Sequence, residues 1–418
     1  MMRDLRMRIL MVSDVYFLRV NGVSTSIQTF RRDLAALGHR CTLIAPAYAG
    51  AIYPDDAATV RLPSRAVPRD PEDRLMSRRA VLDLLPRLRA EQHDIVHVQT
   101  PFVAHYAGVA LAKALELPVV ETYHTYFEHY LHHYVPALPN ALTSWLARRF
   151  TRSQCAAVAA VISPSTAMAD ALRDYGVATR IEVLPTGLDT GRFALGDGAR
   201  FRAAHGIAPQ TPLALFVGRV AHEKNIDFLL RMFVRARAQR SDALFVIAGE
   251  GPAQQHCRDL ARELGLQDAV RFLGYMDRNR ELLDCYRAAD ALVFASRTET
   301  QGLVLLEAMA QGTPVVSTAV MGTIDVLRGT RCSVVVDEDE QRFADALVSV
   351  IGDVGKRAKL AEAARQDAEN WSSSAMAARL AELYAGVIEN SQARHCNVLN
   401  LKDTDEHGKH LAATRRSG

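Results

Sequence analysis

Short apolar runs alternate with amphipathic stretches of helical period along this chain, and this alternation limits the possible folds more than any other feature. The apolar runs of the first half are Arg8–Ser13, Cys41–Ala45, Ile95–Val98, Val119–Thr122, Val158–Ser163 and Ile181–Leu184. Between the first two lies a helical pattern from about Val23 to Leu37, which Gly38 closes. Buried strands separated by such helices predict a parallel sheet covered by helices on both faces.

The alternation stops at Pro185–Gly198, a linker rich in glycine and turn-forming residues, and then starts again. The strands expected in the second half are Leu213–Gly218, Ala243–Ala248, Val270–Leu273, Ala291–Ala295, Pro314–Ser317 and Ser333–Val336, with helices at Phe228–Ala238 and Gln254–Leu264. A chain of 418 residues also exceeds one ordinary domain of roughly 150 residues. We therefore predict two doubly wound, Rossmann-like α/β domains, 1–190 and 191–371, facing each other across a ligand-binding cleft.

The end of the chain carries a different pattern. A last helical stretch, Ser374–Ile388, follows Trp371. The remainder, Glu389–Gly418, is polar and has no clear periodicity. We expect this remainder to be a mobile tail.

Composition excludes several classes of protein. The chain has 50 basic and 47 acidic residues, a net charge of +3, which argues against a general nucleic-acid binder. Its six cysteines are scattered and form no C-x-x-C pair, which is typical of reduced core thiols in a cytoplasmic protein. Met1–Arg8 is charged and the apolar run Ile9–Val12 is short, so we expect no secretory signal. No window reaches 18 apolar residues, so any membrane role is expected to be peripheral.

The common nucleotide fingerprints are absent. Gly249-Glu250-Gly251 follows an expected strand, but Gln254 stands where a third glycine would complete G-x-G-x-x-G. The chain also has no G-x-x-x-x-G-K-[ST] and no H-E-x-x-H. A nicotinamide enzyme, a P-loop protein and a zinc protease of that type therefore lose their support.

The most informative stretch is Thr298–Ser317, in which a polar turn leads into a helix that begins near Gly302. The first N–H groups of a helix and its positive dipole end form an anion site, and glycine lets a ligand approach the backbone. Glu299 precedes the helix and Glu307 lies within it. Two carboxylates so placed can hold two hydroxyl-bearing ends of one ligand, with its phosphates between them. The alternative is an acid that stabilises the helix dipole and a solvated surface glutamate.

This string resembles the E-x7-E signature of the retaining glycosyltransferases of family 4, which have the GT-B fold. Pro185–Asp189 resembles the family's P-N-G-x-D linker, with Thr186 where Asn is common, and Asn21-Gly22-Val23 matches its first glycine loop. Other motifs follow in the family's order, at Phe216–Arg219, His222–Asn225, Val246–Pro252, Phe272–Tyr275 and Ala289–Phe294. The resemblance covers residues 8–390 and implies that a helix at 372–389 returns to the first domain.

The resemblance implies a role for each matched residue. Arg219 and Lys224 would bind the donor pyrophosphate and stabilise the departing nucleoside diphosphate, as a planar fork and a point charge. Glu307 would hold the ribose hydroxyls and Glu299 the donor sugar. The full set of donor-binding positions is Gly22, Gly218, Arg219, Lys224, Gly274, Glu299, Gln301, Gly302, Leu303, Val304 and Glu307. Many family members carry Phe where this chain has Gln301.

A histidine-rich stretch, Thr122–Tyr134, adds a further candidate. His124 follows an expected strand, and in the family a histidine here approaches the donor sugar and is needed for activity. His129, His132 and His133 have helical spacing, so a metal site is an alternative to a pocket lined by aromatic rings and histidines. No nucleophile stands out. We therefore expect a front-face mechanism that needs neither metal nor cofactor, because the cations stabilise the leaving group.

Thr122–Tyr134 and Thr298–Val304 resemble the branch that transfers glucose from UDP-glucose to diacylglycerol at membranes, although Gln99 stands where that branch often has His. The partners expected are therefore a nucleotide-sugar donor, a lipid or saccharide acceptor and an anionic membrane surface. A mannosyl- or glucosyltransferase acting on a lipid inositol or a polysaccharide precursor remains an alternative. A two-lobed solute-binding protein is a rival outside the enzymes.

Residues 129–169 contain no acidic residue, and they include a basic stretch of helical pattern. Leu142, Trp145, Leu146 and Phe150 share one face, with Arg148, Arg149 and Arg152 at its flank. A basic amphipathic helix with a tryptophan is typical of a membrane-surface helix. The alternative is a surface helix whose apolar face lies in the core. Val81, Leu84, Leu85 and Leu88, near several arginines and interrupted by Pro86, form a second candidate with the same alternative.

Overall fold

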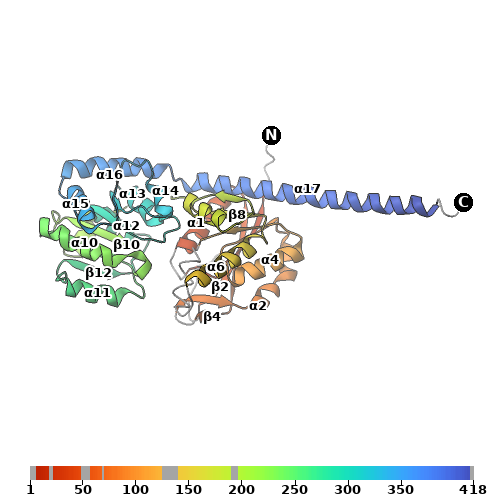
Figure 1. The fold of residues 1–418 in the computed structure, drawn as a ribbon, viewed down its shortest axis with the longest axis horizontal. Helices are drawn as coiled ribbons and strands as arrows, with labels where there is room; N and C mark the ends of the chain where they lie inside the picture. Colours follow the sequence, from red (N-terminus) through yellow and green to blue (C-terminus); the bar gives the residue numbers. More distant parts are fainter. Residues whose placement is uncertain are drawn as a thin grey trace.

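A computed structural model of the protein describes residues 6–17, 22–48, 57–67, 70–124, 140–189 and 196–414. Two parallel sheets, each covered by helices, lie side by side, and two long helices run along one side of both (Figure 1). Each strand predicted from an apolar run is present. The prediction of two doubly wound α/β domains is therefore confirmed.

The N-terminal sheet has the strand order β3-β2-β1-β6-β7-β8-β9, and its strands are parallel. Its strands are β1 (Arg8–Val12), β2 (Arg40–Pro46), β3 (Thr59–Leu62), β6 (Ile95–Val98), β7 (Val119–Thr122), β8 (Ala160–Ser163) and β9 (Ile181–Val183). Ile9 and Met11 pack on one face of the sheet and Leu10 and Val12 on the other. Both faces are apolar because helices cover both.

The helices of this half are α1 (Gly22–Ala36), α2 (Arg78–Leu82), α3 (Leu85–Glu91), α4 (Val103–Leu115), α6 (Asn140–Cys155) and α7 (Thr166–Asp174). A hairpin of β4 (Ser64–Val67) and β5 (Asp70–Met76) was not expected, because its sequence is charged and carries no apolar run. Val81 and Leu88 are buried in the core beneath α2 and α3. The second candidate for a membrane-surface helix is therefore wrong, since its apolar face is used inside the domain.

The C-terminal sheet has the order β12-β11-β10-β13-β14-β15. Its strands are β10 (Leu213–Val217), β11 (Leu244–Ala248), β12 (Val270–Gly274), β13 (Ala291–Phe294), β14 (Val315–Ser317) and β15 (Ser333–Val335). Its helices are α9 (Gly198–Ala204), the short η1 (His222–Lys224), α10 (Ile226–Gln239), α11 (Gln254–Glu263), α12 (Glu281–Ala288), α13 (Leu303–Ala310), α14 (Gly322–Leu327), α15 (Glu340–Ile351) and α16 (Val354–Glu369). The strand order reverses between β10 and β13, as it does between β1 and β6 in the first sheet.

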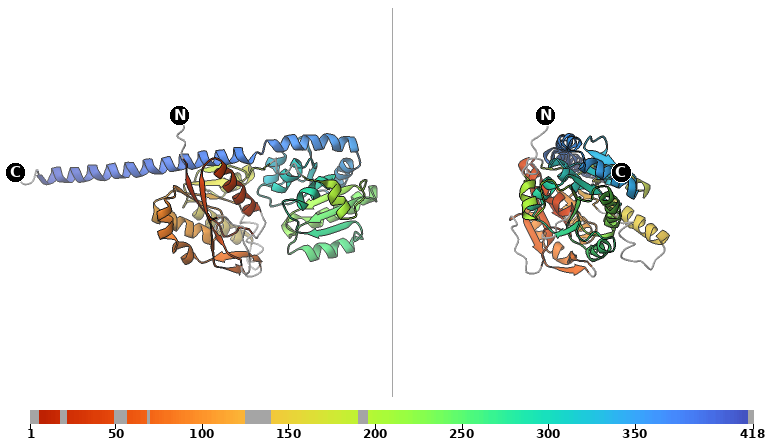
Figure 2. Two further views of the ribbon diagram at one scale, coloured as in Figure 1. Left: turned by 180° about the vertical axis from the view of Figure 1, so that it is seen from behind. Right: turned by 90° about the vertical axis from the view of Figure 1, so that its left-hand side faces the viewer.

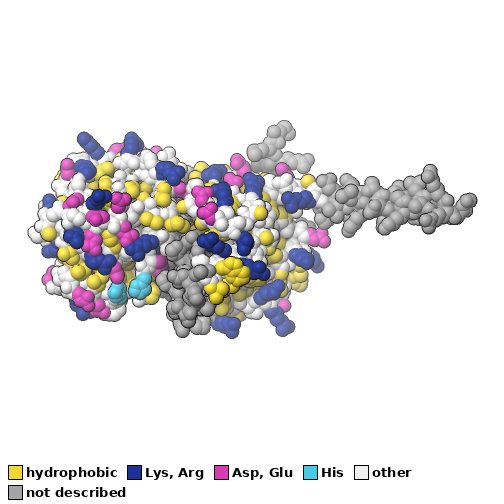
Figure 3. All heavy atoms as spheres, in the orientation of Figure 1, with side chains coloured by type: hydrophobic (Ala, Val, Ile, Leu, Met, Phe, Trp, Pro, Cys, Tyr) yellow, Lys and Arg dark blue, Asp and Glu magenta, His cyan; other side chains and the backbone are white. Residues whose placement is uncertain are grey.

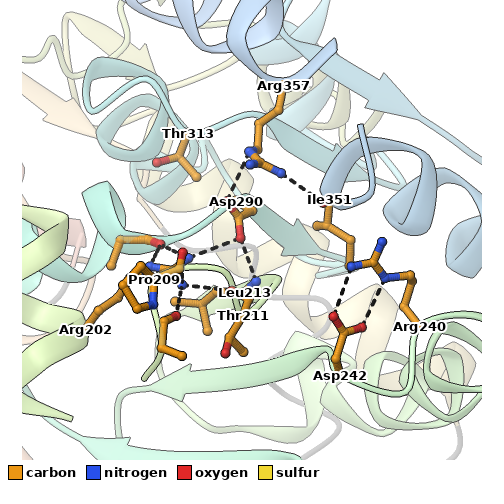
Figure 4. Close-up of polar contacts among 12 residues, drawn as sticks. Arg202, Pro209, Thr211, Leu213, Arg240, Asp242, Asp290, Thr313, Ile351 and Arg357 are labelled. Atoms are coloured by element: carbon orange, nitrogen blue, oxygen red, sulfur yellow. Dashed lines mark hydrogen bonds and ion pairs between the residues drawn. The ribbon is translucent and has the colours of Figure 1, made fainter. Parts of the chain in front are cut away.

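Asp290, the acidic residue of the Ala289–Phe294 motif, connects three elements of this domain through its carboxylate (Figure 4). Its carboxylate accepts hydrogen bonds from Leu213 N at 2.8 Å and Arg202 Nη2 at 3.2 Å, and it pairs with Arg357 Nε at 3.1 Å. These partners belong to the start of β10, to α9 and to α16. This part of the motif therefore serves the fold rather than a ligand.

The chain crosses between the domains twice, and the two crossing segments lie against each other. Leu188 N donates to Trp371 O at 2.7 Å, and Ser373 N donates to Leu188 O at 3.0 Å. A Cβ on Gly187 would lie 2.3 Å from Ser373 Cα, so only glycine permits this approach. Arg32 of α1 donates to Asp189 Oδ2 at 2.9 Å and to Ser373 Oγ at 3.1 Å, which holds both crossings on the N-terminal domain.

The last helix, α17 (Ser373–Thr414), crosses back over the N-terminal domain and extends past it (Figure 2). Leu380, Tyr384 and Ile388 are buried against α1 and the sheet. The sequence predicts a mobile polar tail after Glu389, and in the structure this segment continues the helix to Thr414. The polar sequence has no proline and carries many good helix formers, so it can extend a helix that the packed part has already nucleated.

The five cysteines whose side chains are described are free and buried. This agrees with the expectation of reduced core thiols. No helix in the described parts of the chain is long and apolar enough to span a bilayer.

Candidate functional site

The candidate donor site lies where the strand order of the C-terminal sheet reverses. Ligands of open parallel sheets bind at the carboxyl ends of the strands at this point. Gly218 and Arg219 directly follow β10, and the Glu299–Gly302 loop follows β13. The topology thus brings together segments that lie about eighty residues apart in the sequence.

Glycines allow the loops at this edge to pack backbone against backbone. Gly249 has φ +131°, and a Cβ there would lie 2.0 Å from Gly218 O. A Cβ on Gly251 would lie 2.4 Å from Val220 O, and Val220 N donates to Glu250 O at 2.9 Å. The Gly249-Glu250-Gly251 sequence is therefore not part of a dinucleotide fingerprint. It supports the Gly218–Val220 turn that carries Arg219.

An ion pair joins the two loops of the site. Lys224 Nζ at the end of η1 lies 2.5 Å from Glu299 Oε2, and both side chains are half-buried. Arg297 N donates to Glu223 O at 3.3 Å beside this pair. The structure thus brings together a cation and a carboxylate that sequence reasoning assigned separately to the phosphate and to the sugar.

Helix α13 begins at the same place. Gly302, its N-cap, has φ +89°, a conformation that favours glycine, and it has no side chain with which to cap the first turn. Leu303 and Val304 in that turn are half-buried. The positive end of the helix therefore adds to the charge of Lys224 beside the loop.

Glu307 lies one turn further along α13 and is 1% exposed. It forms an ion pair with Arg278, and Tyr286 Oη donates to its Oε2 at 2.7 Å. Burial raises the pKa of Tyr286 well above its ordinary value, and Glu307 raises the pKa of Arg278. The alternative of a solvated surface glutamate is therefore wrong. Arg278 was not anticipated, although it follows the Phe272–Tyr275 motif closely.

The side chain of Gln301, unlike that of Glu299, contacts the segment that joins the two domains. The side chain is 5% exposed and turns away from the Lys224–Glu299 pair. Its Oε1 accepts from Thr186 N at 2.9 Å and its Nε2 donates to Thr186 O at 2.7 Å. The side chain of Gln301 is therefore directed to the interdomain segment.

On the N-terminal side, His124 follows β7 and places Nε2 3.3 Å from Gln99 Oε1. Burial lowers the pKa of His124 to about 4, so the ring is neutral near pH 7. His97 lies on β6 between Tyr384 Oη at 2.6 Å and Thr122 Oγ1 at 2.7 Å.

The three histidines of the metal-site alternative, His129, His132 and His133, lie outside the described residues. Within the described ranges, no three His, Cys, Asp or Glu side chains are grouped as metal ligands.

Asp14 is a residue that sequence reasoning missed. It follows β1 at the point where the order of the N-terminal sheet reverses, and it is buried. Ala104 N at the start of α4 and Thr100 Oγ1 donate to its carboxylate at 3.0 and 2.9 Å. Burial nevertheless raises the pKa of Asp14 to about 6. The position of Asp14 just after the first strand is the sequence feature that could have identified it.

Helix α6 exposes its large apolar residues instead of burying them. Leu142, Trp145 and Leu146 are 43%, 53% and 39% exposed, and Phe150 is half-buried. The face turned inward carries small and polar residues, namely Thr143, Ala147, Thr151, Gln154 and Cys155. The alternative that the apolar face lies in the core is wrong for the three exposed residues.

Arginines border this apolar face. Arg148, Arg149 and Arg152 are exposed, and the Arg149 guanidinium lies 5.9 Å from the centre of the Trp145 ring. Figure 3 shows a cluster of hydrophobic side chains with basic residues beside it where α6 lies.

Gly22, one of the predicted donor-binding positions, lies at the start of α1 and is exposed. A Cβ on Gly22 would meet no atom within 4 Å.

Two family profiles match the chain, one for each domain. The profile described as Glycosyltransferase Family 4 matches residues 20–192. The profile described as Glycosyl transferases group 1 matches residues 197–367. Together they cover both sheets apart from β1, and they include the loops of the candidate donor site.

Curated relatives point to the same kind of enzyme. The alpha-monoglucosyldiacylglycerol synthase of Streptococcus pneumoniae is 33% identical over 319 residues, which is 74% of this chain and 71% of the relative. The synthase of the same name from Acholeplasma laidlawii is 28% identical over 74% of this chain and 80% of its own length. A GDP-mannose-dependent alpha-mannosyltransferase of Corynebacterium glutamicum is 27% identical over 92% and 90%.

Solved structures share the fold. A sucrose-phosphate synthase of Thermosynechococcus elongatus superposes with a TM-score of 0.73 at 21% identity, over 92% of this chain and 100% of that one. HepE of Anabaena, in complex with UDP, superposes with a TM-score of 0.70 at 17% identity, over 91% and 100%. The predicted GT-B arrangement of two domains is thereby confirmed.

Proposed function

The chain belongs to the family 4 glycosyltransferases, and on this premise we propose that it transfers a hexose from a nucleoside-diphosphate sugar to a membrane lipid. The observation that carries the proposal is the Lys224–Glu299 contact of 2.5 Å beside the N-terminus of α13. A pyrophosphate needs cations and helix N–H groups, and a sugar needs a carboxylate that accepts from its hydroxyl groups. Both kinds of partner meet here.

The nucleoside end of the donor belongs at Glu307. Its carboxylate is already oriented by Arg278 and by the hydroxyl group of Tyr286, so little order has to be gained when ribose hydroxyl groups bind. Glu299 lies in the loop before α13, and Glu307 lies eight positions later, in the middle of this helix. The phosphates then fall between them, at the first turn of this helix.

The transfer retains the anomeric configuration by a front-face route. The leaving phosphate accepts the proton of the acceptor hydroxyl group, while Arg219, Lys224 and the α13 N-terminus stabilise its negative charge. Each charge-assisted hydrogen bond of this kind contributes roughly 1.5–3 kcal/mol. His124 is neutral near pH 7 and offers a hydrogen bond to the sugar rather than a charge. In this mechanism the cations replace a metal.

The acceptor is a lipid such as diacylglycerol, and the donor is UDP-glucose. The names of the two glucosyldiacylglycerol synthases support this choice, and the outward apolar face of α6 supports it independently. Removing a lipid from the bilayer costs about 0.8 kcal/mol for each exposed CH₂ group, so the enzyme has to work at the surface. Trp145 and Leu146 would enter the interface, and Arg148, Arg149 and Arg152 would meet anionic headgroups at the cytoplasmic face.

A donor screen tests the proposal. The protein is incubated with UDP-glucose, UDP-galactose or GDP-mannose, with and without diacylglycerol vesicles, and the released UDP or GDP is measured. We expect UDP release that depends on UDP-glucose and increases with vesicles. Release of GDP from GDP-mannose would favour the mannosyltransferase alternative, which the relative from Corynebacterium glutamicum supports over most of the chain. Binding without any release would favour a solute-binding protein.

A further inference from the structure

The carboxamide of Gln301 is hydrogen-bonded to both backbone polar groups of Thr186 in the interdomain crossing. It accepts from Thr186 N at 2.9 Å and donates to Thr186 O at 2.7 Å, and the two residues are 115 positions apart. Both residues are buried. A carboxamide can match one N–H and one C=O of a peptide chain at the same time, so this contact fixes both position and orientation.

Thr186 is in turn fixed to the N-terminal domain. Its Oγ1 donates to Ser26 Oγ of α1 at 2.7 Å, and Ser26 is also buried. The next residues, Gly187 and Leu188, pack and pair with the second crossing at Ser373. The peptide that Gln301 holds therefore moves with α1 and with the crossing, not with the C-terminal sheet.

The loop that carries Gln301 is equally well fixed to the donor site. Gly322 N donates to Glu299 O at 2.8 Å, and a Cβ on Gly322 would lie 2.0 Å from Thr300 O. Glu299 pairs with Lys224, and Gly302 begins α13. A displacement of Gln301 therefore displaces the carboxylate and the helix end that face the donor.

A second contact joins the same region to the N-terminal domain. Asp325 of α14 accepts a hydrogen bond from Thr166 N in the first turn of α7. Helix α14 begins at Gly322, the residue packed on the Glu299–Gln301 loop. The loop is thus connected to the N-terminal domain on two sides, and Gln301 is its direct connection to the crossing.

We propose that Gln301 is a positioning residue that ties the donor loop to the interdomain crossing, so that Glu299 and the α13 N-terminus are correctly placed only in the arrangement of the two domains seen here. The inference rests on the proposed function for its catalytic consequence. In this proposal the side chain acts through Thr186 and not through the donor, because it is buried and both its oxygen and its nitrogen bond to Thr186. Phenylalanine at this position, which many family members carry, cannot form this connection.

The proposal separates two quantities. Nucleotide affinity depends mainly on Glu307 and its partners in the C-terminal domain and only in part on the helix end, so it should depend on the crossing much less than the rate does. The rate of transfer depends on the position of Glu299 and the helix end, and a misplacement of about 1 Å can lower a rate by about a hundredfold. A side chain that only stabilised the fold would change neither quantity in the folded protein.

The test uses the full chain with Gln301→Leu and Gln301→Glu, and Gln311→Leu as the matched control. Gln311 is equally buried and lies at the other end of α13. For each variant we measure kcat and KM for the donor, the Kd of UDP, and amide hydrogen exchange at Thr186. We expect Gln301→Leu to lower kcat about tenfold or more, to leave the Kd of UDP within about twofold, and to speed exchange at Thr186.

Gln301→Glu keeps an acceptor for Thr186 N but places a carboxylate against Thr186 O. It should therefore keep the slow exchange at Thr186 and still lose transfer rate. Unchanged kcat in both variants would overturn the proposal, and so would a loss of UDP affinity parallel to the loss of kcat. If the wild-type protein releases no nucleoside diphosphate from any donor, the proposed function fails. If amide exchange at Thr186 is unchanged in Gln301→Leu, the connection between Gln301 and Thr186 is absent, whatever the protein's activity.

Discussion

Lys224 Nζ lies 2.5 Å from Glu299 Oε2, so two residues expected to hold different parts of a donor are in direct contact with each other. Their contact neutralises charge at an edge of the sheet where β10 and β13 both end. In the proposed mode of donor binding, Lys224 would contact the pyrophosphate and Glu299 the sugar hydroxyl groups. The two residues would then exchange their ion pair for two sets of charged hydrogen bonds.

Lys224→Met should lower kcat/KM for the donor by about 10- to 150-fold, because one charge-assisted phosphate contact of roughly 1.5–3 kcal/mol is lost. The pair is partly solvated, so the unfolding temperature should fall by no more than about 4 °C. Steady-state kinetics and thermal unfolding measure the two effects. Arg342→Ala, on an exposed part of α15, serves as the control. Equal kinetics for Lys224→Met and wild type would remove Lys224 from the donor site.

Glu307→Gln should destabilise the C-terminal domain by about 3–5 kcal/mol, because it leaves Arg278 partly buried beside a neutral side chain. Tyr286→Phe removes only one hydrogen bond to the same carboxylate and should cost about 1 kcal/mol. Urea unfolding followed by tyrosine fluorescence, together with UDP binding, distinguishes the two variants. If Glu307→Gln is as stable as wild type, the ion pair with Arg278 contributes nothing to the fold.

Stability should fall in acid because of buried histidines. Burial lowers the pKa of His97 to about 3 and of His124 to about 4, so both bind fewer protons in the folded state than in the unfolded state. Their contribution is complete above about pH 6.5 and is lost as the pH falls through 4 towards 3. Asp14 has a pKa raised to about 6 and acts in the opposite sense, since its contribution is lost as the pH rises through 6.

The opposite effects of the histidines and of Asp14 on the pH dependence of stability can be separated by mutation. His97→Gln should flatten the decrease in unfolding temperature between pH 6.5 and 4, and Asp14→Asn should make it steeper, because it removes the opposing group. Thermal unfolding at half-unit pH steps measures both slopes. A slope unchanged in His97→Gln would mean that the burial of His97 does not control the acid limb.

Removal of divalent metal should leave donor turnover almost unchanged. The positive charge that stabilises the leaving phosphate comes from Arg219, Lys224 and the first turn of α13 in the proposed mechanism. Released UDP is measured in the presence of EDTA and again after Mg²⁺ or Mn²⁺ is added. A complete loss of activity that metal restores would contradict a mechanism based on these cations alone.

The triple variant Arg148→Gln, Arg149→Gln, Arg152→Gln should no longer sediment with anionic vesicles. Each basic residue near such a surface contributes on the order of 1 kcal/mol, and salt weakens the attraction. Wild type should sediment at low salt and be released at high salt, while hydrolysis of the nucleotide sugar in solution should be the same in both proteins. Replacing Arg231, Arg235 and Arg342 of the C-terminal domain is the control. Sedimentation of the triple variant at the wild-type level would exclude α6 as the attachment.

Much of the fold follows from the order of residues along the chain. Runs such as Leu213–Val217 are apolar throughout, which is the pattern of a short strand covered on both faces. Parallel strands end at a common edge, which is why the segments after β10 and β13 lie at the same end of the sheet. The charged hairpin β4–β5 and the polar end of α17 were not predicted, because neither carries an apolar period for a core to select.

Sequence by itself determined the alternation of strands and helices, the residue types at the donor edge and the arginines of α6, because these depend on local pattern and chemistry. The tertiary structure alone decided in which direction each side chain points and which residue it contacts. Trp145 points outward because small residues such as Thr143 and Ala147 fit against the domain on the opposite face. Gln301 reaches Thr186 and not a ligand because folding brings the crossing segment within 3 Å of its carboxamide. A side chain's partner depends on which distant surface packs against it, and no local pattern encodes that distance.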